Sequence, residues 1–203
     1  MIKKIVLTAI ALVSFLTLDA QAGIAEHVVK ESIVKHSMEM GVDPALALSI
    51  AKKESGFKHE LKSPYGAVGV FQVLPSTAKK IGYNPYYLNE NIKAGLTYYK
   101  MMYKMFGSTE LALAAYNAGP GNVKKYGGTI PPFRETKRFV NVIMQDYQHF
   151  KNNPDPIMAK YATKTAIAPD KNTELEEKSK ECDLPDLKEI PETREAEAVM
   201  EIL

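Results

Sequence analysis

The sequence predicts a mainly α-helical domain followed by a charged, flexible tail. Between residues 24 and 150, apolar residues recur at the spacing of one helix face. Glycine and proline fall between these periodic segments, where helices begin and end. Beyond Phe150 the periodicity fades into a stretch rich in Glu, Lys and Pro. We therefore expect one helical domain over residues 23–150 and a largely disordered tail over residues 151–203.

The N-terminus has the layout of a secretory signal peptide. Residues 1–4 carry two lysines, residues 5–18 form a 14-residue apolar run, and Ala20-Gln21-Ala22 offers small residues for cleavage. A membrane-spanning helix needs about 20 apolar residues, so we expect no permanent membrane span. The sequence thus predicts a signal peptide over residues 1–22 and export to the periplasm, with the protein wall-associated or secreted. Cys182 is the only cysteine, which excludes an intramolecular disulfide.

The helices are expected in a definite order. An apolar face over residues 24–40 ends at Gly41, and Asp43-Pro44 then supplies an N-cap and a first-turn proline for a helix that ends near Glu54. Residues 56–73, rich in glycine, are expected to form a loop with a short hairpin. The remaining helices are expected over residues 75–81, 91–106, 109–117 and 134–150, with one further turn over residues 122–126.

Charge divides the chain into two parts. Residues 23–150 carry 16 Lys/Arg and 10 Asp/Glu, a balance of +6, whereas residues 151–203 carry 8 and 13, a balance of −5. A basic domain is attracted to anionic polymers, such as nucleic acid or the bacterial wall. The signal peptide favours the wall, and no nucleic-acid motif is recognised, so we expect no nucleic-acid binding. Scattered, solvated lysines account for the composition equally well.

Glu54 is the residue most suited to acid–base chemistry. It lies at the end of a helix that is otherwise almost entirely apolar, and near a helix C-terminus, where the dipole disfavours negative charge. Both features raise the pKa of a carboxyl, as a general acid requires. A solvated surface glutamate is the alternative interpretation.

Four sequence blocks occur together and in order. They begin at Glu54-Ser55-Gly56, at Gly66 (GAVGVFQVLPSTA), at Ala115 (AYNAG) and at Glu135 (ETKRFV). Over roughly residues 26–150 the chain resembles the transglycosylase SLT domain of family 1 soluble lytic transglycosylases, whose fold is similar to goose-type lysozyme. Each block is weak alone, but four in the right order are specific.

The resemblance implies a role for each matched position. Glu54 matches the catalytic acid/base, and Glu135 matches an acidic position that we treat as structural or part of the cleft wall. The substrate-binding positions implied by the resemblance are Ser63, Gln72, Tyr116 and Asn117. Each of these four also has a purely structural interpretation, as a turn, loop or core residue.

Two matched positions depart from the family pattern. Phe71 stands where Met is common, and Phe139 stands where Tyr is usual. At Phe139 the ring remains but a hydroxyl is lost. If that hydroxyl normally contacts the catalytic carboxyl, Tyr116 alone must do so here.

The activity implied is cleavage of the bond between N-acetylmuramic acid and N-acetylglucosamine in peptidoglycan, with formation of a 1,6-anhydro ring and without any cofactor or metal. The alternatives are a muramidase that uses water on the same fold and a non-catalytic peptidoglycan-binding subunit. We expect a monomer whose substrate is the glycan strand. The charged tail suggests a partner in a secretion, conjugation or pilus machine, although a passive solubilising tail is equally consistent with its composition.

Overall fold

A computed structural model describes residues 26–167; the expected signal peptide and residues 168–203 of the expected tail lie outside this range. A first helix covers residues 26–39. It is followed by α2 (Pro44–Ser55), α3 (Pro75–Lys80), α4 (Leu88–Phe106), α5 (Thr109–Ala118), α6 (Pro120–Lys125), α7 (Arg134–Asn152) and α8 (Pro156–Ile167). The described residues contain isolated β-bridges but no strand. The expected mainly α-helical fold is confirmed.

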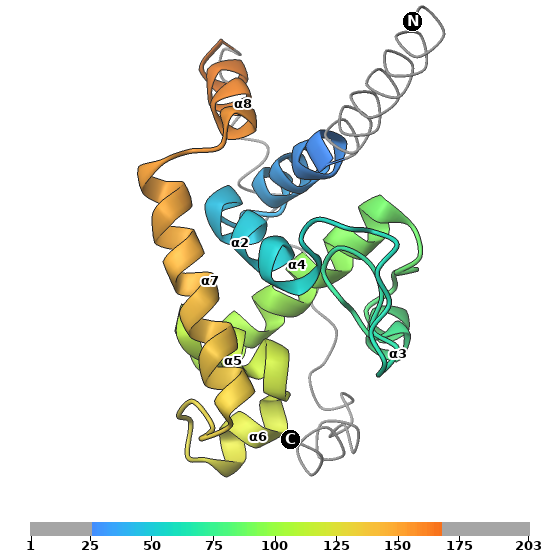
Figure 1. Cartoon of the computed structure of the whole chain (residues 1–203), viewed down its shortest axis with the longest axis vertical. Coiled ribbons are helices and arrows are strands. Elements are labelled where there is room, and N and C mark those ends of the chain that lie inside the picture. The colour runs from blue at the N-terminus through green and yellow to red at the C-terminus, as the bar shows by residue number, and fades with distance from the viewer. Residues whose placement is uncertain (1–25, 168–203) are drawn as a thin grey trace, which may run out of the picture.

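The helices surround α2. In Figure 1, α7 runs along one side of the molecule, α3 and the preceding loop lie on the opposite side, and α2 and α4 lie between them. The most extensive helix contacts are those of α2 with α7, α4 with α5, and α5 with both α6 and α7. Every residue of α2 from Ala45 to Ala51 is buried. Because burial of apolar surface stabilises a helix far more than its intrinsic propensity does, α2 is a fixed support for its own last turn.

Both ends of α2 follow from the sequence. The Asp43 carboxylate accepts a hydrogen bond from the backbone N–H of Ala45 (2.9 Å), and Pro44 occupies the first turn, where its missing N–H costs nothing. At the other end Gly56 adopts φ 58°, a left-handed conformation that an L side chain disfavours, and its N–H bonds to the carbonyl of Lys52. The helix therefore stops one residue after Glu54 is placed, with Ser55 its last residue.

The loop over residues 56–73 is held by buried polar contacts instead of strands. Only the bridges Lys62–Val68 and Val68–Val73 remain of the expected hairpin. Asn91, buried inside α4, accepts from the N–H of Phe71 (2.9 Å) and donates to the carbonyl of Val68 (2.9 Å). A side chain at Gly69 would collide with Asn91. One helix residue thereby satisfies several loop backbone groups that burial would otherwise leave unpaired.

Gly95 lets Phe71 approach α4. A Cβ at Gly95 would overlap the Phe71 side chain, and Phe71 itself is fully buried. The middle of the loop is therefore anchored on α4 by a ring that packs against bare backbone.

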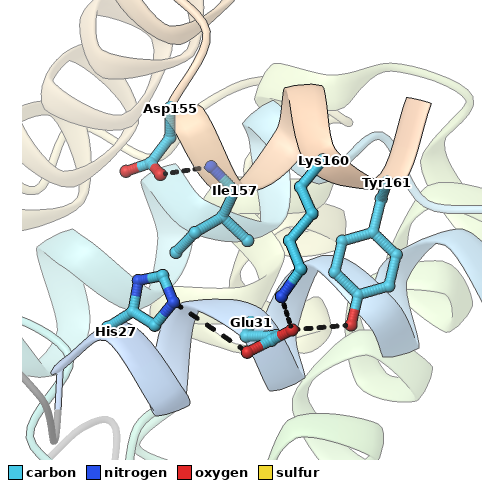
Figure 2. Close-up of polar contacts among 6 residues, drawn as sticks. All are labelled: His27, Glu31, Asp155, Ile157, Lys160 and Tyr161. Carbon is cyan, nitrogen blue, oxygen red and sulfur yellow. Dashed lines mark hydrogen bonds and ion pairs between the residues drawn. The ribbon is translucent and has the colours of Figure 1, made fainter. Parts of the chain in front are cut away.

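Residues 151–167 correct one expectation. We expected them to belong to a largely disordered tail, but α7 continues to Asn152 and α8 packs against the first helix. Ile157 is only 4% exposed, and Asp155 accepts from the Ile157 N–H (3.0 Å) as helix caps do. Glu31 accepts from Lys160 (2.7 Å) and from the hydroxyl of Tyr161 (3.4 Å), as Figure 2 shows. This contact joins positions about 130 residues apart, which a local hydrophobic pattern does not reveal.

No helix within residues 26–167 is both long enough and apolar enough to cross a membrane.

Candidate active site

The carboxyl of Glu54 lies among protein atoms although part of the residue remains exposed. Burial raises the pKa of Glu54 from its ordinary 4.5 to about 8. Burial is the largest cause because a charged carboxylate loses its hydration there. A carboxyl with this pKa is protonated at neutral pH, which agrees with the expectation drawn from its place at the end of an apolar helix.

Two charged side chains modify this pKa in opposite directions. Lys53, the preceding residue on α2, lowers the pKa of Glu54, and Glu135 in the first turn of α7 raises it. The ammonium Nζ of Lys53 lies 3.6 Å from Oε1 of Glu135. Glu135, expected to be a structural or cleft-wall position, is therefore placed beside the residue preceding Glu54, where its charge reaches the candidate acid.

Tyr116 of α5 lies near Glu54. Burial raises the pKa of Tyr116 well above its usual range, and the charge of Glu54 raises it further. The Tyr116 hydroxyl donates to the backbone carbonyl of Phe71 (2.8 Å). Its ring stacks on Phe139 with the centroids 6.5 Å apart. The Tyr116 proton is thus directed at the loop backbone and not at the Glu54 carboxyl.

Gln72 has a strained backbone, and its side-chain NH₂ is hydrogen-bonded within the loop. Its φ of 44° lies in the left-handed region, where non-glycine residues are uncommon. Nε2 donates to the carbonyls of Leu61 (3.1 Å) and Gly69 (2.8 Å). Both amide hydrogens therefore hold the loop, as the structural interpretation of this residue anticipates, and only the amide oxygen remains for a ligand.

The side chains of Ser63 and Asn117 each make one hydrogen bond within the protein. The hydroxyl oxygen of Ser63 accepts from the N–H of Ala67 (3.0 Å), which closes a turn in the loop. The amide oxygen of Asn117 accepts from the hydroxyl of Thr136 (2.8 Å). Thr136 is 2% exposed whereas Asn117 is exposed. Ser63 keeps a hydroxyl hydrogen, and Asn117 keeps its amide NH₂, for contact with a ligand.

Two residues of this site were missed by sequence reasoning. Tyr98 of α4 packs its ring against Tyr116 with the centroids 5.2 Å apart, and burial raises the pKa of Tyr98 to about 12. The signal available was its position one turn after Gly95, on the helix face that meets the loop. Lys53 carried no signal, because a lysine in the last turn of a helix is ordinary.

No group of three potential metal ligands is found within residues 26–167. A pocket of about 360 Å³ lies away from Glu54, between the first helix and α8. Its charged side chains pair with one another: Lys30 contacts both Glu26 (2.8 Å) and Asp155 (3.3 Å). The candidate site is therefore defined by Glu54 and its neighbours, not by this pocket.

The described helical domain holds one readily protonated carboxyl, Glu54, near Tyr116, an arrangement that suits general-acid chemistry. Residues 31–137, more than half of the chain, match the family model described as the transglycosylase SLT domain, and the chain belongs to this family. The resemblance seen in the four sequence blocks is confirmed.

Relatives and solved structures agree with this assignment. A soluble lytic murein transglycosylase from Salmonella typhimurium is 33% identical over 58% of this chain. The structure of an inactive glutamate-to-glutamine mutant of lytic transglycosylase Slt from Pseudomonas aeruginosa covers 62% of the chain with a TM-score of 0.54 and 27% identity. A complex of the 70-kDa soluble lytic transglycosylase with bulgecin A covers 63% with a TM-score of 0.55 and 26% identity. The expected lysozyme-like SLT fold is confirmed.

These proteins are much longer than the region that they share with this chain. The match covers 22% of the Salmonella relative and 25% of each of the two solved chains.

Proposed function

We propose that this chain is a peptidoglycan lytic transglycosylase in which Glu54 is both the acid and the base. The observation that carries the proposal is the buried Glu54 carboxyl, whose pKa of about 8 keeps it protonated at neutral pH. The family membership and the murein-acting relative support the choice of peptidoglycan. The inactive glutamate-to-glutamine mutant of the Pseudomonas protein supports an essential glutamate in this fold.

The reaction proceeds in two proton transfers. Glu54 donates its proton to the glycosidic oxygen between N-acetylmuramic acid and N-acetylglucosamine, and the bond from that oxygen to C1 breaks. The 2-acetamido group of the muramic residue stabilises the cation formed at C1. Glu54, now a carboxylate, takes the proton of the 6-hydroxyl while O6 bonds to C1. A 1,6-anhydro ring forms, the leaving sugar keeps the first proton, and Glu54 regains one.

The charged groups around Glu54 favour a mechanism in which Glu54 alone serves as acid and base. Hydrolysis with water as nucleophile usually requires a second carboxylate beside the scissile bond. Within residues 26–167, Glu135 is the only other carboxylate whose charge acts on Glu54, and it is exposed and paired with Lys53. The internal 6-hydroxyl needs no second carboxylate to activate it, which favours transglycosylation over the muramidase alternative.

The polar groups left unpaired are suited to an amide-bearing sugar. We assign substrate binding to the amide oxygen of Gln72, the NH₂ of Asn117 and the hydroxyl hydrogen of Ser63. Acetamido groups and sugar hydroxyls both donate and accept hydrogen bonds, so they complement these groups. Tyr116 lies near Glu54, but its hydroxyl proton is not free for the sugar because it is donated to the Phe71 carbonyl.

The test is the replacement Glu54→Gln combined with product analysis. We expect digestion of purified peptidoglycan by the unchanged protein to release 1,6-anhydro ends, detected by mass spectrometry. Because the glutamine amide has no proton to donate, the rate should fall by roughly a hundred-fold to ten-thousand-fold. Unchanged lysis by the variant would remove Glu54 from the mechanism. Reducing ends in place of anhydro ends would establish the muramidase, and binding without lysis by either form would establish the non-catalytic alternative.

We further propose that the protein acts in the periplasm after cleavage behind Ala22, and that the acidic tail recruits an envelope-spanning secretion, conjugation or pilus machine. The motivation is the signal-peptide layout and the opposite charges of domain and tail. Deleting residues 168–203 retains α8 and so tests the tail alone. Lost machine assembly with intact wall cleavage supports recruitment, whereas normal assembly contradicts it.

A further inference from the structure

Two adjacent lysines at the end of α2 make parallel contacts with α7. Lys52 Nζ lies 2.6 Å from Oδ1 of Asp146 and 5.7 Å from the centroid of the Phe150 ring. Lys53 Nζ lies 3.6 Å from Oε1 of Glu135 and 5.5 Å from the centroid of the Phe139 ring. Each ammonium is therefore held by one carboxylate and one aromatic face of α7. The two residues that hold Lys53 lie at least two helical turns away from the two that hold Lys52.

The two lysines differ in what else they reach. The Lys53 side chain is 25% exposed and that of Lys52 is 45% exposed. Lys53 is the only cation, within the part of the chain that the structure describes, whose charge acts on Glu54. Lys53 directly precedes Glu54 in α2, and the Phe139 ring beneath its ammonium stacks on Tyr116, whose pKa is affected by the charge of Glu54. Lys52 makes its contacts with α7 three turns away and only joins the two helices.

We propose that Lys53 is a positioning residue of the reaction, whose ammonium, fixed by Glu135 and the Phe139 ring, stabilises the carboxylate that Glu54 becomes after it donates its proton. This inference rests on the proposed acid/base role of Glu54. The two proton transfers require Glu54 to be a sufficiently strong acid first and a base second. The fixed Lys53 ammonium favours the first transfer because it stabilises the negative charge that forms on Glu54. The ammonium cannot itself accept a proton, so the Glu54 carboxylate remains the base for the second transfer.

The other titratable groups near Glu54 cannot supply this charge. Burial and the charge of Glu54 raise the pKa of Tyr116 of α5, and burial raises the pKa of Tyr98 of α4, which packs on Tyr116. Both phenols therefore stay neutral over the working range. The Tyr116 hydroxyl also donates to the Phe71 carbonyl. Glu135 of α7 is negative and acts against the Glu54 carboxylate, except through the ammonium that it holds in place.

The direction of the expected change follows from the charges. Glu54 must be protonated to start the reaction, so kcat/KM falls as pH rises through the pKa of Glu54 in the free enzyme. Lys53→Met removes the cation and makes the Glu54 carboxylate less favourable. The fall of kcat/KM at high pH, the alkaline limb of the profile, should therefore move to higher pH. Glu135→Gln removes the anion and moves the limb to lower pH. The double variant should lie between the two single variants.

The experiment measures kcat/KM for peptidoglycan against pH in these variants of the full chain. We expect Lys53→Met to move the alkaline limb up by roughly 0.5 to 1 pH unit and to lower the maximum rate. Lys53→Arg keeps the charge and should retain the original limb. The matched control is Lys52→Met, which breaks an equivalent contact with α7 and should leave the limb in place.

The outcomes separate this inference from the proposed function. An unmoved limb in Lys53→Met, or an equal shift in Lys52→Met, overturns the role of Lys53 while anhydro products and an inactive Glu54→Gln variant keep the function intact. An active Glu54→Gln variant overturns the function itself. If Lys53→Met does not fold by circular dichroism, Lys53→Gln, which also removes the ammonium charge, decides: an unmoved limb in Lys53→Gln overturns the inference.

Discussion

Glu54 keeps its proton at neutral pH through a balance of three causes. Burial and the charge of Glu135 both disfavour the carboxylate, whereas Lys53 favours it. Burial wins, because the loss of hydration of a charged group exceeds what one partly exposed lysine returns. The same residue must nevertheless ionise once in each cycle, so a pKa close to the working pH suits both of its proposed roles.

Tyr116, which lies near the candidate acid, is hydrogen-bonded to the loop over residues 56–73. The Tyr116 hydroxyl donates to the backbone carbonyl of Phe71, and the backbone N–H of Phe71 donates to the side chain of Asn91. Both backbone groups of one buried loop residue are therefore bound by side chains from two different helices. This arrangement places Gln72, the next residue, in its strained conformation without any β-strand.

Tyr116→Phe tests this connection. The substitution keeps the ring but leaves the buried Phe71 carbonyl without its donor, so we expect unfolding to become easier by about 1–3 kcal/mol. We also expect lower activity, because the loop that carries Gln72 is less firmly held. Urea denaturation measures the first effect and peptidoglycan digestion the second. Tyr65→Phe, at an exposed ring in the same loop, is the control. Equal urea midpoints for Tyr116→Phe and the unchanged protein would contradict the connection.

At the scale of elements, the last turn of α2 serves three neighbours at once. Lys53 contacts α7, Glu54 lies near Tyr116 of α5, and the Ser55 hydroxyl donates to the carbonyl of Val70 (2.9 Å). Consecutive residues on a helix point about 100° apart, so three adjacent side chains reach three directions. The candidate site therefore lies where one helix end meets two helices and a loop.

Several helix boundaries were predictable because their causes are local, whereas α4 begins three residues before the expected residue 91 and α6 two residues before the expected residue 122. Asp43-Pro44 starts α2, Gly56 ends it, and Gly107 ends α4, each through contacts or dihedral angles within a few residues. The raised pKa of Glu54 was also predictable, since a carboxyl at the end of an apolar helix is buried wherever that helix packs. The roles given to Ser63, Gln72 and Asn117 remain predictions that came from resemblance.

What the sequence did not reveal depends on contacts between distant segments. The docking of α8 rests on Ile157 and on the pair Lys160–Glu31, which has no periodic signature. The ring contact of Tyr98 on α4 with Tyr116 on α5, and the approach of Glu135 on α7 to Lys53, both join separate helices. The commitment of the Gln72 amide to Leu61 and Gly69 likewise needs the folded loop.

At the scale of the whole molecule, the site is carried by the most deeply buried helix. α2 packs on α7, and α5 links α7 to α4, so the elements that surround Glu54 form one continuous core. A rigid core holds the carboxyl away from water, and the same burial imposes a cost on the folded state whenever that carboxyl ionises.

This cost predicts how stability depends on pH. The pKa of Glu54 is about 8 when folded and ordinarily 4.5. Above pH 4.5 the unfolded chain releases this proton while the folded chain retains it up to about pH 8. The folded state thus binds more protons within this window, and its stability falls as pH rises. Glutamine resembles the protonated carboxyl but never ionises, so Glu54→Gln should abolish this particular loss.

We expect Glu54→Gln and the unchanged protein to unfold at similar urea concentrations near pH 4, where the carboxyl is protonated in both states. At pH 8 the variant should be more stable by on the order of 2 kcal/mol, less than the full pKa shift implies because water and relaxation moderate burial. The control is Glu60→Gln, at an exposed loop glutamate, which should show no such pH-dependent gain. A stability difference that stays constant between the two pH values would mean that Glu54 ionises as readily in the folded protein as in the unfolded chain, and the acid would then have to be sought elsewhere.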